Sequence, residues 1–363
     1  MFKKFDKFIY FILLTNFILI VILNKPQIFP DSIYYYNEGI KYFENNYQST
    51  SLKILYSIWI FINYLSTYFE DNWYFLIILI NLSASLIIIS CSLYLLNLNK
   101  LSDIIIFLFI QLFCVDLWIY NSYILSDLLF TGIALLTFLL VYKYHTEYQN
   151  KFLFLASFSL LFLFFLRPTS LPVFIFFIFS FLTKLKKINK MGLVFYLPLF
   201  LALILIIALI QYFLIKYQIP FNLEIIKSYI YWKKLQFVDG IVINDRPEYN
   251  LNAINNFLSI IKYNIYKLIQ FYNFAPIGYS SSHKIINLTY LLIITMAIIK
   301  FKYIDKKTLN KNALFLSLLF IISFGIFHMI TIIDYDWRYR LPILPILSIM
   351  PFLIFKKNKS YVF

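Results

Sequence analysis

Apolar blocks of about 15 to 25 residues recur along this chain of 363 residues, and they contain almost no charged side chains. A helix needs about 20 apolar residues to cross the hydrocarbon core of a bilayer, which is about 30 Å thick. Charged residues make up 13% of the chain and hydrophobic residues 62%, against about 25% and 45–50% in soluble domains. The sequence therefore predicts an all-α, polytopic membrane helical bundle and excludes a soluble globular fold.

The blocks predict about ten transmembrane helices in a single integral membrane domain, residues 1–363. They cover residues 8–24, 73–96, 101–119, 122–142, 152–166, 168–183, 191–215, 285–299, 312–333 and 341–355. A single long helix from Phe152 to Leu182 would place the basic segment 184–190 outside the cell. We therefore predict a tight hairpin with Arg167 at its outer tip, where Pro168 ends the first helix.

Two outer segments are long enough to build structure of their own: residues 25–72 and residues 216–284. In the first outer loop, Asp31 follows Pro30 and is predicted to cap a helix that starts at Ser32. That helix carries a stripe of apolar and aromatic residues, which suits a position in the membrane interface. In the second outer segment, residues 252–272 have helical spacing and are predicted to form another interfacial helix.

The net charge of +15 has a simple explanation in this layout. With the N-terminus inside, the cytoplasmic segments carry 18 basic and four acidic residues, as expected when basic loops resist translocation. Both termini are then cytoplasmic, and nucleic-acid binding is excluded as a cause of the charge. The two cysteines, Cys91 and Cys114, sit inside apolar blocks and are predicted to be small buried residues, not disulfide partners or metal ligands.

Arginine is rare and unevenly placed. The chain has 32 Lys and Arg residues, of which four are Arg, and all four lie on the predicted outer side. These are Arg167, Arg246, Arg338 and Arg340. A guanidinium presents a planar fork of donors that matches phosphate or carboxylate, which lysine does not reproduce. Snorkelling at helix ends is the alternative explanation for each one.

The acidic residues have a similar bias, because 13 of the 17 lie on the outer side. A carboxylate at Asp31, held at the membrane surface, is a candidate general base for an acceptor hydroxyl. Asp127, at the head of the fourth span, is a candidate for binding substrate or metal. A simple helix cap remains the structural alternative for both, with Ser126 as another cap for the fourth span.

The last outer turn, DYDWRYR, packs charges and rings together. Asp336, Arg338 and Arg340 could pair with one another, with Tyr339 as part of an interfacial aromatic anchor. Alternatively, the arginines meet the phosphate of a lipid-linked donor at headgroup depth. In the second outer segment, Trp232 offers an aromatic face on which a sugar ring can stack.

The order of these segments resembles the membrane glycosyltransferases of the GT-C fold, in particular the bacterial relatives of protein O-mannosyltransferases and the lipid A aminoarabinose transferase. The resemblance rests on a pattern and not on one unique motif. Its elements are PDSIYYYNEG after the first span, LSDLLFTGIALL, FLRPTSLPVF at the hairpin, and WRYRLPILPIL before the last span. Together they cover most of residues 1–183 and 334–355.

The resemblance implies an enzyme of the bacterial cell (inner) membrane, with a polyprenyl-phosphate-linked sugar as donor and a glycan, lipid or protein as acceptor on the outer face. It implies Asp31 near the reaction centre and the arginines near the donor phosphate. Many relatives have two adjacent acidic residues in the first loop, whereas Asp31 is followed by Ser32, and this puts a two-carboxylate mechanism in doubt. Dependence on a divalent metal stays open.

Two other functions remain open at this point. An oligosaccharide repeat-unit polymerase of the O-antigen or capsule type would also have a large outer loop, and Arg246 in the second outer segment is compatible with it. A lipid or polysaccharide flippase or transporter would carry ionisable residues at mid-membrane depth, whereas here the charges gather at one mouth.

Overall fold

The computed structural model describes residues 6–44, 56–96, 98, 100–189, 268–276, 279–330 and 337–355. Within these ranges the chain is helical, and its β-type pairing is one isolated parallel bridge between Gln27 and Tyr123. The prediction of an all-α fold is confirmed for these residues. The helices are α1 (Asp6–Asn24), α2 (Pro30–Glu44), α4 (Ser57–Ser66), η1 (Thr67–Asn72), α5 (Tyr74–Leu96), α6 (Leu101–Phe113), α7 (Val115–Trp118), η2 (Ile119–Asn121), α8 (Asp127–Glu147), α9 (Asn150–Leu166), η3 (Pro168–Ser170), α10 (Leu171–Asn189), α15 (Ser281–Ile299), η6 (Lys300–Ile304), α16 (Lys311–Ile330), η7 (Trp337–Ile343) and α17 (Leu344–Ile354).

Four helical stretches in the described part of the chain are long and apolar enough to cross a membrane. They are Tyr74–Leu96, Asp127–Glu147, Ser281–Ile304 and Lys311–His328. A fifth is added if α6 and the helical turns after it are counted as one bent span. Several long apolar helices are thus compatible with an integral membrane protein, while the number of ten spans stays a prediction. The predicted span 191–215 lies outside the described residues.

The predicted span 101–119 is not one straight helix. It breaks at Cys114, and the two parts are bent by 61°. The indole Nε1 of Trp118 donates a hydrogen bond of 2.6 Å to the carbonyl of Gln111, so a side chain replaces part of the interrupted backbone ladder. The predicted hairpin is present, since α9 ends at Leu166 and α10 starts at Leu171.

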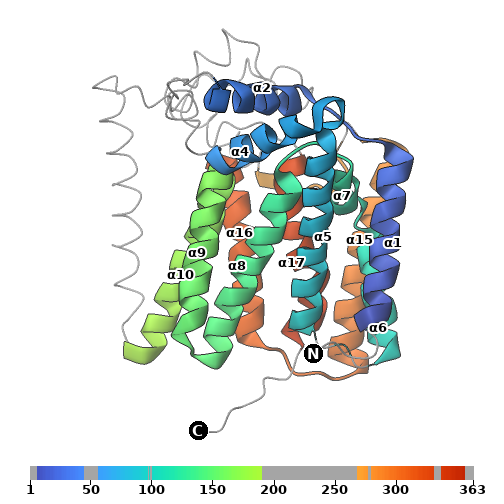
Figure 1. The fold of residues 1–363 in the computed structure, drawn as a ribbon. Coiled ribbons are helices and arrows are strands. Elements are labelled where there is room, and N and C mark those ends of the chain that lie inside the picture. Colours follow the sequence, from blue (N-terminus) through green and yellow to red (C-terminus); the bar gives the residue numbers. More distant parts are fainter. Residues whose placement is uncertain are drawn as a thin grey trace, which may run out of the picture.

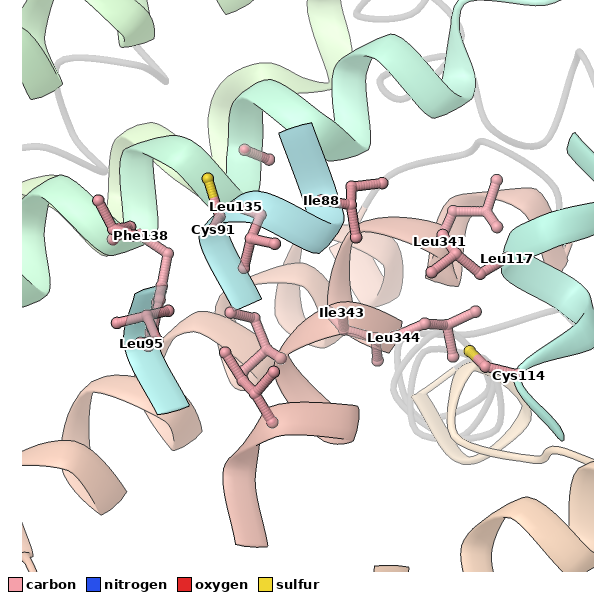
Figure 2. Close-up of a cluster of buried hydrophobic side chains, with 14 of the residues drawn as sticks. Ile88, Cys91, Leu95, Cys114, Leu117, Leu135, Phe138, Leu341, Ile343 and Leu344 are labelled. Atoms are coloured by element: carbon pink, nitrogen blue, oxygen red, sulfur yellow. The ribbon is translucent and has the colours of Figure 1, made fainter. Parts of the chain in front are cut away.

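The core forms where α5, α8 and the C-terminal helices meet. Figure 2 shows Leu95 of α5 beside Phe138 of α8, with Ile88 of α5 and Leu344 of α17 in the same cluster, and all four are buried. Gly132 lets α5 and α8 approach closely, because a Cβ there would lie 3.1 Å from the Ala84 carbonyl oxygen. Both cysteines are buried and unbridged, as predicted: Cys91 and Cys114.

Helices α2 and α4 lie across one end of the upright helices, and the start of α1 and the end of α17 lie towards the other end (Figure 1). We call the first of these the α2 end. The two crossing helices pack closely at Gly39, where an added Cβ would lie 2.8 Å from the backbone nitrogen of Tyr64. This arrangement matches the interfacial helices expected in the first outer loop, although their depth in a membrane remains a prediction.

The opposite end holds a cluster of lysines and carboxylates. Lys300 Nζ lies 2.9 Å from a carboxylate oxygen of Asp103, and Lys307 Nζ lies 3.4 Å from the other oxygen. Asp305 lies within 4 Å of both lysines. This network joins the start of α6 to the end of α15. That this end faces the cytoplasm stays a prediction.

Candidate functional site

The start of α2 is tied to the connection between α7 and α8. The backbone nitrogen of Gln27 donates to the Ser122 carbonyl at 2.8 Å, and the nitrogen of Ile124 donates to the Gln27 carbonyl at 3.1 Å. The Ser32 hydroxyl donates to the Ile124 carbonyl at 2.7 Å and accepts from the Phe29 nitrogen at 3.0 Å. These bonds hold the chain immediately before and after Asp31 in a fixed position.

Asp31 does not cap α2. The helix starts at Pro30, two residues earlier than predicted, because the fixed φ of proline suits the first helical turn. Asp31 therefore lies within the first turn, and the carbonyl of Phe29 accepts the first backbone hydrogen bonds. Its side chain is 52% exposed, and one carboxylate oxygen accepts a hydrogen bond of 3.0 Å from Arg338 Nη1.

Asp127 and Arg167 form a buried ion pair between Arg167 Nη1 and Asp127 Oδ1. Asp127 is the first residue of α8. Ser126, which precedes it, makes no capping hydrogen bond through its side chain. Arg167 lies in extended backbone between α9 and η3, just before Pro168. Burial acts to lower the pKa of the Arg167 guanidinium, but Asp127, Tyr339 and Tyr56 together raise the pKa above its usual range, so the guanidinium stays charged.

Tyr339 lies between two of the arginines. Its ring centroid is 5.6 Å from the Arg167 guanidinium carbon and 5.3 Å from that of Arg338, which are cation–π distances. The ring of His328, near the end of α16, has its centroid 5.7 Å from the Tyr339 ring. A single aromatic side chain therefore links cations from the α9–α10 hairpin and from η7.

These side chains line a cleft at the α2 end. The charged and polar part of its wall comes from Asp127, Arg167, Arg338, Tyr339 and His328. The remaining wall is largely aromatic and consists of Phe130, Thr169, Phe271, Phe324, Phe327 and Pro342. The cleft has a volume of about 20 Å³, close to the space that one water molecule needs, so an anionic group beside the arginines or a sugar beside the rings requires the cleft to open further.

Arg340 belongs to a second, closed cluster. It is completely buried, donates to the Asn273 carbonyl and to the Tyr279 hydroxyl at 3.0 Å, and lies 3.5 Å from a carboxylate oxygen of Asp116. Asp116 also accepts hydrogen bonds from His283 and, at 3.1 Å, from Asn287. The residues that line the cleft do not include Arg340.

Three of these residues were not singled out by sequence reasoning: Asp116, His283 and His328. Asp116 and His283 are separated by 167 positions in the chain, and no local motif marks either of them. His283 stacks on Tyr279, with the ring centroids 4.1 Å apart and the planes 6° apart. Only the packing of α7 against α15 brings the pair together.

Three predicted binding residues have no described side chain. Trp232 and Arg246 fall in the second outer segment, and Asp336 falls just before η7; all three lie outside the described residues. Among the residues that the structure does describe, no group of three or more His, Cys, Asp or Glu side chains is placed to hold a metal ion. Metal dependence therefore stays open.

The chain was also compared with known proteins, and no protein-family model, curated protein or solved structure matches it.

Proposed function

We propose that this protein is a membrane glycosyltransferase, which moves a sugar from a polyprenyl-phosphate carrier to a hydroxyl of a glycan, lipid or protein. The observation that carries the proposal is the cleft at the α2 end. Asp127, Arg167 and Arg338 come from three separate segments and line it together with Tyr339, and Asp31 is joined to it through its hydrogen bond with Arg338. The adjacent helices are apolar enough to keep a lipid carrier beside the cleft.

The exposed pair in this group favours a ligand over a purely structural role. Asp31 is 52% exposed and the Arg338 side chain 24%, and ion pairs with such exposure contribute little to stability. A cation in the wall of this cleft suits the phosphate of a lipid-linked donor. When that donor reacts, its phosphate leaves with negative charge, and positioned guanidiniums stabilise this charge in the transition state.

The proposed step needs one base and one leaving group. The acceptor hydroxyl oxygen forms a bond to the anomeric carbon of the sugar, and the bond from that carbon to the phosphate oxygen breaks. The electron pair of the broken bond goes to the phosphate oxygen, which leaves as polyprenyl phosphate. The hydroxyl proton goes to the Asp31 carboxylate, and Arg167 and Arg338 hold the phosphate.

The test is sugar transfer by the purified full chain in detergent. Polyprenyl-phosphate donors that carry different radiolabelled sugars are offered one at a time, with membranes of the producing cell as the source of acceptor. We expect transfer of label from the donor to a product, and Asp31→Asn to lower the rate about 10²- to 10⁴-fold. Asp71→Asn, the same change at an exposed position in η1, is the matched control and should retain the rate.

Two outcomes contradict the proposal. Full transfer by the Asp31→Asn variant would remove Asp31 from the reaction. Movement of the labelled lipid across a proteoliposome membrane without loss of its sugar would show a transporter instead, since a flippase leaves its cargo chemically unchanged.

A further inference from the structure

The three described arginines of the α2 end are held in different ways. Arg340 is sealed in the closed cluster, and Arg167 is 7% exposed and bound to a buried carboxylate. Arg338 differs from both, because its carboxylate partner Asp31 is half exposed and accepts from it at 3.0 Å, while its other Nη donates to the Tyr339 hydroxyl at 3.4 Å. Among these three, Arg338 is therefore the guanidinium that can change its partner with the least disturbance of the packing.

Arg167 retains an unused donor. Its Nη1 binds Asp127, but its buried Nε has no hydrogen-bond partner among the described residues. Arg167 lines the cleft. A buried donor without a partner is unfavourable unless something fills its place. The wall of the cleft thus contains a buried donor that an acceptor atom can satisfy.

Both guanidiniums contact the ring of Tyr339, at 5.6 and 5.3 Å from its centroid. The charge of Arg338 acts against that of Arg167, and an anion near both relieves this repulsion. Asp31 supplies one carboxylate to Arg338, and Asp127 supplies one to Arg167. A phosphate has more acceptor oxygens than a carboxylate and more charge than Asp31, so it can accept from both guanidiniums at once.

We propose that Arg338 and the Nε of Arg167 form a phosphate subsite, and that Asp31 takes the place of the phosphate at Arg338 while the subsite is empty. A lipid phosphate that enters the cleft displaces Asp31 from Arg338. This inference rests on the proposed function for its consequence: the displaced carboxylate loses its cationic partner and becomes available to the acceptor hydroxyl. Donor binding then precedes activation of the acceptor.

The test measures binding and not turnover. The probe is farnesyl phosphate, a short isoprenoid monophosphate without sugar, titrated into the purified full chain in detergent by microscale thermophoresis. Asp31→Asn removes the competing charge and should bind the probe at least threefold more tightly than the unmodified chain. Arg338→Gln should bind it at least tenfold more weakly, and the double variant should be as weak as Arg338→Gln alone.

Three controls define the source of the effect. Asp71→Asn changes an exposed carboxylate outside the cleft and should leave the affinity unchanged. Farnesol lacks the phosphate, so its binding should be the same for all variants. Inorganic phosphate lacks the lipid and should bind at least tenfold more weakly than farnesyl phosphate; equal affinity would overturn the assignment to a lipid phosphate. If Arg338→Gln does not fold, Arg338→Lys replaces it, with a loss of at least threefold because the fork is gone.

The inference is overturned if Asp31→Asn binds farnesyl phosphate no more tightly than the unmodified chain, or if the gain persists when Arg338 is absent. These outcomes can occur even when sugar transfer is observed, so the proposed function survives them. Conversely, the expected pattern of affinities without any sugar transfer supports the phosphate subsite and removes the glycosyltransferase assignment.

Discussion

Arg338 and Arg340 lie two residues apart on η7, and their surroundings are opposite. Arg338 faces the cleft, with 24% of its side chain exposed and a half-exposed carboxylate as partner. Arg340 has no exposed surface, and its polar partners are Asn273, Tyr279 and Asp116. In a 3₁₀ helix of three residues per turn, residues two apart point about 120° away from each other. One arginine of this short helix can therefore contact a ligand, while the other is buried and stabilises the packing of the fold.

The comparison shows that an outer arginine is not in itself a functional signal. Sequence reasoning grouped Arg338 with Arg340 as cations for a donor phosphate. The structure separates them, because Asp116 reaches Arg340 from α7 and excludes it from the cleft wall. Arg167 is intermediate, since it lines the cleft and also forms a buried ion pair.

The largest expected effect on stability is that of Arg340→Gln. Removing one member of a buried ion-pair network leaves Asp116 without its cation, which costs about 3–5 kcal/mol. Arg338→Gln should cost less than about 1 kcal/mol, because its pair is exposed. Thermal unfolding in detergent, followed by tryptophan fluorescence, measures both. Equal losses from the two variants would contradict the division of η7 into a ligand-facing and a packing arginine.

The next effect concerns the intermediate arginine. Arg167→Gln and Asp127→Asn each leave one buried partner unpaired and should each lower the free energy of unfolding by about 3 kcal/mol. The double variant should lose less than the sum of the single losses, with a coupling of about 2 kcal/mol. Strict additivity of the two losses would show that the pair does not form, and Arg167 would then be free to act as Arg338 does.

Much of the fold could be predicted from the sequence, because bilayer-length apolar blocks and proline leave few alternatives. The hairpin at Arg167 follows from Pro168 and from the basic segment after it. The break at Cys114 could not be predicted, since neither Gly nor Pro stands there. It depends on a hydrogen bond from Trp118 to Gln111, which exists only in the folded chain.

The sequence could predict several residues of the candidate site, but not which of them contact one another. Asp31, Asp127 and Arg167 stand out in the sequence as charges beside apolar spans. The sequence could not show that Arg338 reaches Asp31 across 307 positions, or that His328 joins the same cleft. Such contacts arise from the packing of distant helices, and a local pattern carries no information about them.

A smaller effect should follow from crowding the contact between α2 and α4. In Gly39→Ala the new methyl group would lie 2.8 Å from the Tyr64 nitrogen and 3.1 Å from the Ile60 carbonyl oxygen. Backbone atoms cannot rotate away, so α2 must shift, at a cost of about 1–3 kcal/mol. Because α2 carries Asp31, the affinity for farnesyl phosphate should rise, as it does in Asp31→Asn. The closed cluster around Arg340 lies away from this contact. An unchanged melting temperature together with unchanged affinity would contradict the close packing.

The smallest expected effect, Ser32→Ala, isolates the tether that holds the beginning of α2. The buried Ser32 hydroxyl donates to the Ile124 carbonyl, and losing one such hydrogen bond costs about 1 kcal/mol. The fold should survive, but the parallel bridge at Gln27 should open more often. Hydrogen exchange at the Ile124 amide, which donates to the Gln27 carbonyl, should therefore become faster.

The control is Ser83→Ala. Ser83 is an exposed serine on α5 that forms a hydrogen bond within its own helix, so this variant should leave both the exchange and the melting temperature unchanged. Faster exchange in both variants would show that the tether does not determine the position of Asp31, which would then depend on the hydrogen bond from Arg338 alone.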